Sequence, residues 1–110
     1  MLSEFTNLIK WEDNVRVLGH GTATDLSPED ALAIALAAEP VTSSGVADND
    51  PQGLKVGDVV SVGPDVESGE QFVEGKVRQA DAHTIVVERT AGEVGNVCVH
   101  FPRTGYRIDV

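Results

Sequence analysis

The chain has 110 residues, a formal net charge of −10, 41% hydrophobic residues and a single cysteine, Cys98. This length allows one domain, or one domain with a helical arm, and the hydrophobic fraction argues against disorder. One cysteine excludes an intramolecular disulfide and a cysteine-based zinc site, and it fits a reducing compartment. The N-terminus lacks a secretory signal and no apolar run is long enough to span a membrane, so we predict a cytoplasmic protein. The acidic charge disfavours binding to nucleic acid or to anionic membranes.

Residues 1–39 are predicted to form a helical arm made of two helices. In the first helix, Phe5, Leu8, Ile9 and Val15 recur at helical spacing, with Trp11 beside them. The glycine at position 19 is a natural C-terminal stop for this helix.

The second helix has clearer boundaries in the sequence. Ser27 is a good N-cap, Pro28 suits the first helical position, and Pro40 ends the helix. The residues between them, 31–38, are apolar on nearly every side, so the helix must be covered from more than one direction. A second subunit could supply this cover, and we therefore predict a homodimer that self-associates through the N-terminal helices.

Residues 40–53 are rich in turn-forming residues and are predicted to be a linker, while residues 54–110 are predicted to form a small β-barrel. Short stretches with period-two apolar residues alternate with turn signals. The predicted fold is α+β, with two N-terminal helices followed by a small five-stranded SH3-like β-barrel. The residues that mark the five strands are Val60 and Val62; Val73, Gly75 and Val77; Ile85 and Val87; Val97, Val99 and Phe101; and Tyr106, Ile108 and Val110.

Residues that could carry chemistry are few. Cys98 and His100 lie two apart on one strand face, which allows a nucleophile hypothesis, but no third orienting group can be named and two ordinary surface residues are favoured. His20, between two glycines, could mark an active-site turn, although a helix cap followed by a turn is favoured. Metal binding by His20, His83 and His100 has no spacing motif behind it. No catalytic, cofactor-binding or metal-binding residue is therefore assigned.

Two groups of charged residues are also candidate ligand sites. The loop carboxylates lack the order of a calcium loop, so a solvated surface is favoured over a calcium site. Four basic side chains beside Phe72 could form an oligonucleotide-binding patch, but nearby acidic residues, among them Glu74 and Glu88, favour paired surface charges. The carboxylates are Asp48, Asp50, Asp58, Asp65, Glu67 and Glu70, and the basic residues are Lys76, Arg78, Arg103 and Arg107.

Several stretches of the sequence resemble a known family. The segments 53–65 (GLKVGDVVSVGPD), 73–75 (VEG) and 99–107 (VHFPRTGYR) resemble the C-terminal extension of bacterial glutathione S-transferase-like proteins. Trp11, the residues Arg16 and Val17, the Gly19-His20-Gly21 turn and the helix start at 27–32 are similar to the last helical part of the same proteins. The resemblance covers roughly residues 11–110, and the string Val-His-Phe-Pro-Arg is its most specific part.

The resemblance implies a function only for part of such a protein. In that superfamily an N-terminal thioredoxin-like domain holds glutathione and supplies the catalytic residue, and this chain has no room for it, so no glutathione-site residue is carried over. We expect a non-catalytic binding or assembly module without a cofactor. The alternatives are a fragment or subunit of a glutathione transferase-type enzyme that is inactive alone, and a nucleic-acid-binding barrel, which the net charge of −10 disfavours.

Overall fold

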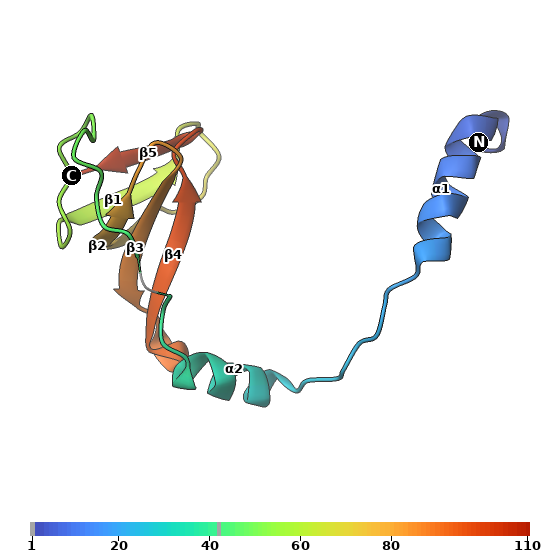
Figure 1. Cartoon of the computed structure of the whole chain (residues 1–110), viewed down its shortest axis with the longest axis horizontal. Helices are drawn as coiled ribbons and strands as arrows, with labels where there is room; N and C mark the ends of the chain where they lie inside the picture. Colours follow the sequence, from blue (N-terminus) through green and yellow to red (C-terminus); the bar gives the residue numbers. More distant parts are fainter. Residues whose placement is uncertain (1, 42) are drawn as a thin grey trace.

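The computed structural model describes residues 2–41 and 43–110 and shows two helices followed by a five-stranded antiparallel sheet (Figure 1). This confirms the α+β class predicted from the sequence. The elements are a short 3-10 helix η1 (Leu2–Glu4), α1 (Thr6–Leu18), α2 (Pro28–Ala37), β1 (Val59–Pro64), β2 (Val73–Ala80), β3 (Thr84–Thr90), a 3-10 turn η2 (Gly92–Val94), β4 (Asn96–Pro102) and β5 (Tyr106–Asp109).

The helix boundaries follow the local signals in the sequence. The Ser27 hydroxyl oxygen accepts a hydrogen bond from the backbone N–H of Asp30 at 3.1 Å, and Pro28 is the first residue of α2. Gly19 follows α1 with φ of 64°, in the left-handed region that glycine adopts without strain. The predicted cap, first turn and stop are therefore confirmed.

The sheet has the strand order β4-β3-β2-β1-β5, and every neighbouring pair is antiparallel. The register shifts between Val77 and Gln79 of β2, which marks an irregularity in its pairing with β3. In the described part of the chain no ladder joins β4 to β5, so these two strands are the edges of an open sheet. The five predicted strands are confirmed, whereas closure of the sheet into an SH3-like barrel is not.

One apolar core lies against the sheet and holds it together. Its buried members come from β1, β2, β3 and β5 and from Leu54 in the loop before β1, and those of β1 and β3 fall at the alternate positions that place side chains on one face of a strand. Val99 and Phe101 of β4 pack against this core, as the alternation of the sequence predicts. The buried members are Leu54, Val60, Val62, Val77, Ala80, Ile85, Val87 and Ile108.

The segment that leads from the arm into the sheet is held along the end of β2. The backbone N–H of Ala47 donates to the carbonyl oxygen of Ala80 at 2.8 Å, and the N–H of Ala80 donates to the carbonyl oxygen of Gly45 at 3.1 Å. The Ser43 hydroxyl donates to the carbonyl oxygen of Arg78 at 3.1 Å. These contacts tie residues 43–47 to the sheet, so the arm leaves the sheet from a fixed point.

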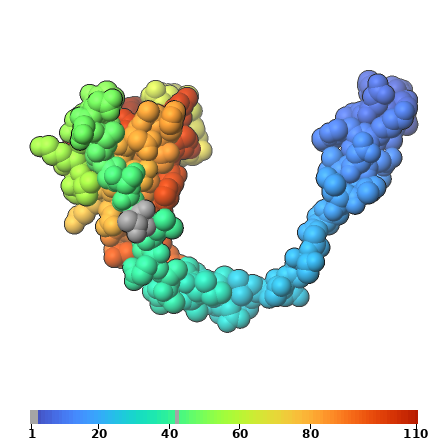
Figure 2. Space-filling model, in the orientation of Figure 1, coloured from blue at the N-terminus to red at the C-terminus, as the bar shows by residue number. Residues whose placement is uncertain are grey.

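Beyond this point the helices extend away from the sheet (Figures 1 and 2). The radius of gyration is 19.9 Å, compared with about 13 Å for a compact chain of this length. No residue of α1 or α2 is buried. None of the helices in residues 2–41 and 43–110 has the length and apolar character needed to cross a lipid bilayer. The sheet is thus the compact part of the molecule, and α2 meets it at its C-terminal end, beside η2 and β4.

Candidate functional site

The residues weighed for catalysis and metal binding are dispersed in the structure. His20 lies in the arm, His83 in the turn between β2 and β3, and His100 on β4, and all three are exposed. Cys98 and His100 share the face of β4 opposite Val99, beside a groove of about 300 Å³ that the end of α2 and residues 39–41 also line. In the described ranges, no three His, Cys, Asp or Glu side chains are placed to hold one metal ion.

The basic residues weighed as a nucleic-acid patch are mostly ion-paired. Arg78 contacts Glu88 at 2.6 Å, as the paired-charge interpretation expects. Arg107 contacts the exposed carboxylate of Asp109 at 3.1 Å, and its guanidinium also lies 5.0 Å from the centre of the Phe72 ring. These contacts neutralise the surface on which a phosphate backbone would have to bind.

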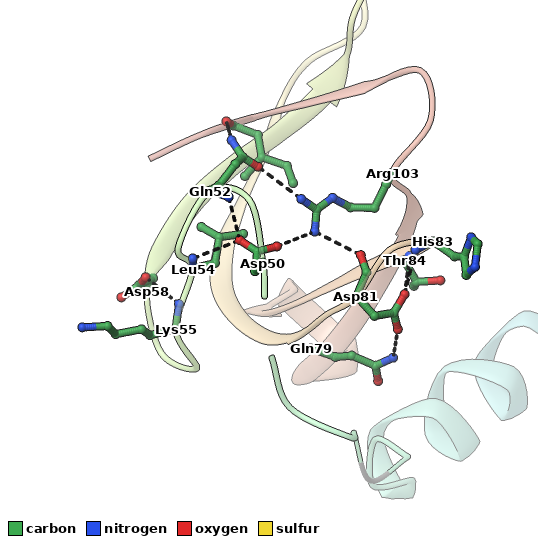
Figure 3. Close-up of polar contacts among 11 residues, drawn as sticks. Asp50, Gln52, Leu54, Lys55, Asp58, Gln79, Asp81, His83, Thr84 and Arg103 are labelled. Atoms are coloured by element: carbon green, nitrogen blue, oxygen red, sulfur yellow. Dashed lines mark hydrogen bonds and ion pairs between the residues drawn. The ribbon is translucent and has the colours of Figure 1, made fainter. Parts of the chain in front are cut away.

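A third basic residue of that group, Arg103, forms a part-buried ion pair with Asp50, which we call the latch (Figure 3). Its Nη1 lies 3.0 Å from Oδ1 of Asp50, and the Asp50 side chain is only 3% exposed while that of Arg103 is 15% exposed. The same nitrogen donates to the carbonyl oxygen of Asp81 at 3.2 Å, and Nη2 donates to the amide oxygen of Gln52 at 3.4 Å. The latch fixes the 50–54 loop against the turn after β2.

Both aspartates of this region are held in their ionised form. Burial of the Asp50 carboxylate raises its pKa, but hydrogen bonds from the backbone N–H groups of Leu54 and Gln52 and the charge of Arg103 outweigh burial, so the pKa is lowered. The pKa of Asp81 is lowered because its carboxylate accepts hydrogen bonds from the backbone of His83, the side-chain amide of Gln79 and the backbone of Thr84. The region is therefore a structural anchor, in which Asp50 and Asp81 accept hydrogen bonds from backbone N–H groups and Arg103 joins the two residues.

The latch was not predicted from the sequence. Asp50 was weighed only as one of several loop carboxylates, and Arg103 as part of a basic patch. The one available signal was that Arg103 ends the Val-His-Phe-Pro-Arg string, the most specific part of the family resemblance. The other loop carboxylates either accept hydrogen bonds from nearby residues of the chain or face solvent. Asp58, for example, accepts a hydrogen bond from the backbone N–H of Lys55 at 2.9 Å.

The surface most unlike an ordinary protein surface is the apolar side of the arm. Large apolar side chains of α1 and α2 stand in solvent, and Trp11, the single tryptophan, is 62% exposed. Monomeric proteins rarely leave so many large apolar residues uncovered along one segment. The exposed set is Phe5, Leu8, Trp11, Val15, Val17, Leu18, Leu32, Ile34 and Leu36, and we refer to it as the arm surface.

Comparison with known proteins finds similarity among solved structures. No protein-family model matches the chain. No curated protein matches it either. Among solved structures it is similar to a GST-like protein from Pseudomonas syringae, with 31% sequence identity and a TM-score of 0.79.

The similarity includes nearly all of this chain but less than half of the GST-like protein. It covers 98% of this chain but 39% of the other chain, so this chain spans about two fifths of the length of the GST-like protein. The resemblance to GST-like proteins inferred from the residues is thereby supported. Because the match includes nearly the whole chain, the arm is part of the shared structure.

Proposed function

We propose that the chain is a non-catalytic assembly module of a GST-like protein, in which the sheet is the self-supporting part and the arm surface docks onto the remaining body. The observation that carries the proposal is the exposure of the arm surface, together with a relative in which the matching segment is accompanied by further chain. Covering one large apolar side chain contributes about 1.5–3 kcal/mol, so the arm surface offers ample driving force for docking.

The site chemistry supports a module rather than an enzyme. The buried polar side chains near the sheet are engaged with each other in the latch, and Cys98 and His100 face outward without a hydrogen bond to an orienting group in the described residues. The alternative of a transferase fragment or subunit that is inactive alone uses the same docking surface. In both cases the activity would reside in the body that the arm meets.

A chimera tests the docking role directly. In it, this chain replaces the matching segment of the Pseudomonas syringae protein, and thermal unfolding is followed with the double substitution Leu8→Lys and Val15→Lys in α1. We expect the lysines to lower the midpoint by several degrees, because they would bury charge at the interface. The matched control, Thr6→Lys and Thr22→Lys, adds the same charge to the arm at two exposed polar positions that are not part of the arm surface, and it should leave the midpoint within about one degree.

Equal midpoints for the two double variants would overturn the proposal, because the arm surface would then face solvent in the complete protein. Self-association of the helices, which the sequence predicted, remains a prediction. It would show itself as a concentration-dependent dimer of the unaltered chain that the lysines in α1 abolish.

A further inference from the structure

The two edges of the sheet are treated differently by the rest of the chain. The edge strand β5 is short and carries an ion pair between Arg107 and Asp109. Its outer side is also covered, because the side-chain amide of Gln52 donates to the carbonyl oxygen of Ile108 at 3.2 Å. Short length, charge and cover are the features by which proteins prevent an edge strand from pairing with another chain.

The opposite edge, β4, is protected much less: Pro102 ends the strand, and the end of α2 with residues 39–41 lines a groove beside Cys98 and His100. It is seven residues long, Asn96–Pro102, and it contains no Lys, Arg, Asp or Glu. It pairs with β3 on one side. In residues 2–41 and 43–110, no backbone hydrogen bond outside that ladder reaches a residue of β4. The outward N–H and C=O groups of this strand thus form a template for one more strand.

We propose that β4 pairs with the β4 strand of a second copy, antiparallel about a two-fold axis, so that two sheets become one continuous sheet. One open edge and one blocked edge lead to a closed pair, whereas an endless sheet would need two open edges. The combination of a protected β5 and an open β4 therefore specifies a dimer.

The sequence of β4 is complementary to itself in this arrangement. Val99 and Phe101 pack against the core, and Cys98 and His100 lie on the other face. In any two-fold register centred on a residue of the strand, apolar residues lie opposite apolar residues and the outer-face residues lie opposite each other. A partner strand of a different pattern would place polar groups over the core.

Charge also favours β4 over the other exposed surfaces as the place where a second copy binds. Two chains of net charge −10 repel each other, and most exposed surfaces would bring carboxylates together. Along β4 no like charges meet, since the strand itself is uncharged. Because the pairing of one strand is smaller than a standard interface, we expect a dissociation constant in the range of about 10 to 300 µM.

The test is sedimentation equilibrium of the 110-residue chain between about 10 and 500 µM. The double substitution Cys98→Lys and His100→Lys places lysines opposite one another in each register centred on residues 98–100. We expect the dissociation constant to rise about tenfold or more, since like charges directly opposite destabilise strand pairing. The matched control, Val66→Lys and Gln71→Lys, adds the same charge to an exposed loop and should leave the dimer unchanged or slightly tighter.

Amide hydrogen exchange of the unaltered chain gives a second readout that does not depend on a variant that folds. The outward amides of β4 should become protected as the concentration rises through the dissociation constant, while those of β5 do not change. A monomer at about 500 µM would overturn the proposal. So would a dimer that survives the β4 lysines but is lost on Leu8→Lys and Val15→Lys. Neither result depends on the outcome of the chimera, which tests docking of the arm.

Discussion

At the scale of single residues, the contact between Arg103 and Asp50 is the main device that holds the loop to the sheet. The two residues are 53 positions apart, so no local pattern could have paired them. The sequence shows that Arg103 ends the Val-His-Phe-Pro-Arg segment, but it does not show that Asp50 is the carboxylate with which Arg103 pairs. The helix caps, by contrast, involve residues three or four apart, and for that reason the sequence predicted them.

Arg103→Ala should destabilise the fold strongly. The substitution leaves the Asp50 carboxylate, 3% exposed, without its cation, and removing one partner of a buried pair costs about 3–5 kcal/mol. Urea unfolding followed by far-UV circular dichroism measures the loss. The control is Arg78→Ala, which breaks the more exposed pair with Glu88 and should cost about 1 kcal/mol or less. Similar losses for the two variants would show that the latch adds nothing beyond a surface pair.

The latch also predicts how stability depends on pH. The pKa of Asp50 in the folded chain is below 3.8, its ordinary value, so its contribution to stability is fully present above that pH. The contribution is lost as the pH falls below 3.8 and through the folded pKa. The chemical shift of the Asp50 side-chain carboxyl carbon, followed by NMR during an acid titration, should have its midpoint below 3.8. A midpoint at or above that value would contradict the geometry of the latch.

Gly63 in β1 is required because the Phe72 ring occupies the space of a side chain. A methyl group at this position would overlap the ring, while Phe72 in turn lies under the guanidinium of Arg107. Gly63→Ala should therefore lower the free energy of unfolding by about 1–3 kcal/mol. Adding Phe72→Ala in a double-mutant cycle should recover part of this loss. Strict additivity of the two substitutions would mean that the ring does not contact Gly63 in solution.

At the scale of elements, strands and helices were predictable because each has its own period in the sequence. Alternation of apolar residues identified β1 to β5, and Ser27 with Pro28 identified the start of α2. Closure of the sheet was not predictable, because the local period does not say which strands become edges. The protection of β5 by Gln52 depends on a contact 56 residues apart, which only the folded chain brings together.

Ser27→Ala should separate the stability of α2 from that of the sheet. The substitution removes the cap to the N–H of Asp30 and costs about 1 kcal/mol, which matters for a short helix that meets the rest of the chain only near its C-terminal end. Helix content measured by circular dichroism should fall, while the unfolding midpoint of the sheet should not move. As a control, Ser68→Ala in the loop before β2 should change neither quantity. A fall in the midpoint of the sheet would indicate that α2 packs on it in solution.

At the scale of the whole molecule, the sequence indicated that the helices need cover but could not say where the cover lies. A small sheet could have covered one face of each helix. In the structure it meets only the end of α2, near η2 and β4, because residues 43–47 are fixed along β2 and the arm leaves the sheet from there. The radius of gyration of 19.9 Å is large for a chain of this length because the arm extends away from the sheet. The apolar side chains of the arm are therefore not part of the core of the sheet, and we propose that they dock onto another polypeptide surface.

The most direct test of this account is amide hydrogen exchange of the isolated 110-residue chain at low micromolar concentration, measured by mass spectrometry. We predict that β1, β2 and β3 are strongly protected, because they enclose the core. The amides of α1 should exchange nearly as fast as those of an unfolded peptide, because a helix of 13 residues without tertiary contacts is marginal in water. Protection of α1 equal to that of the sheet would contradict the account, since the arm would then be packed within a single chain.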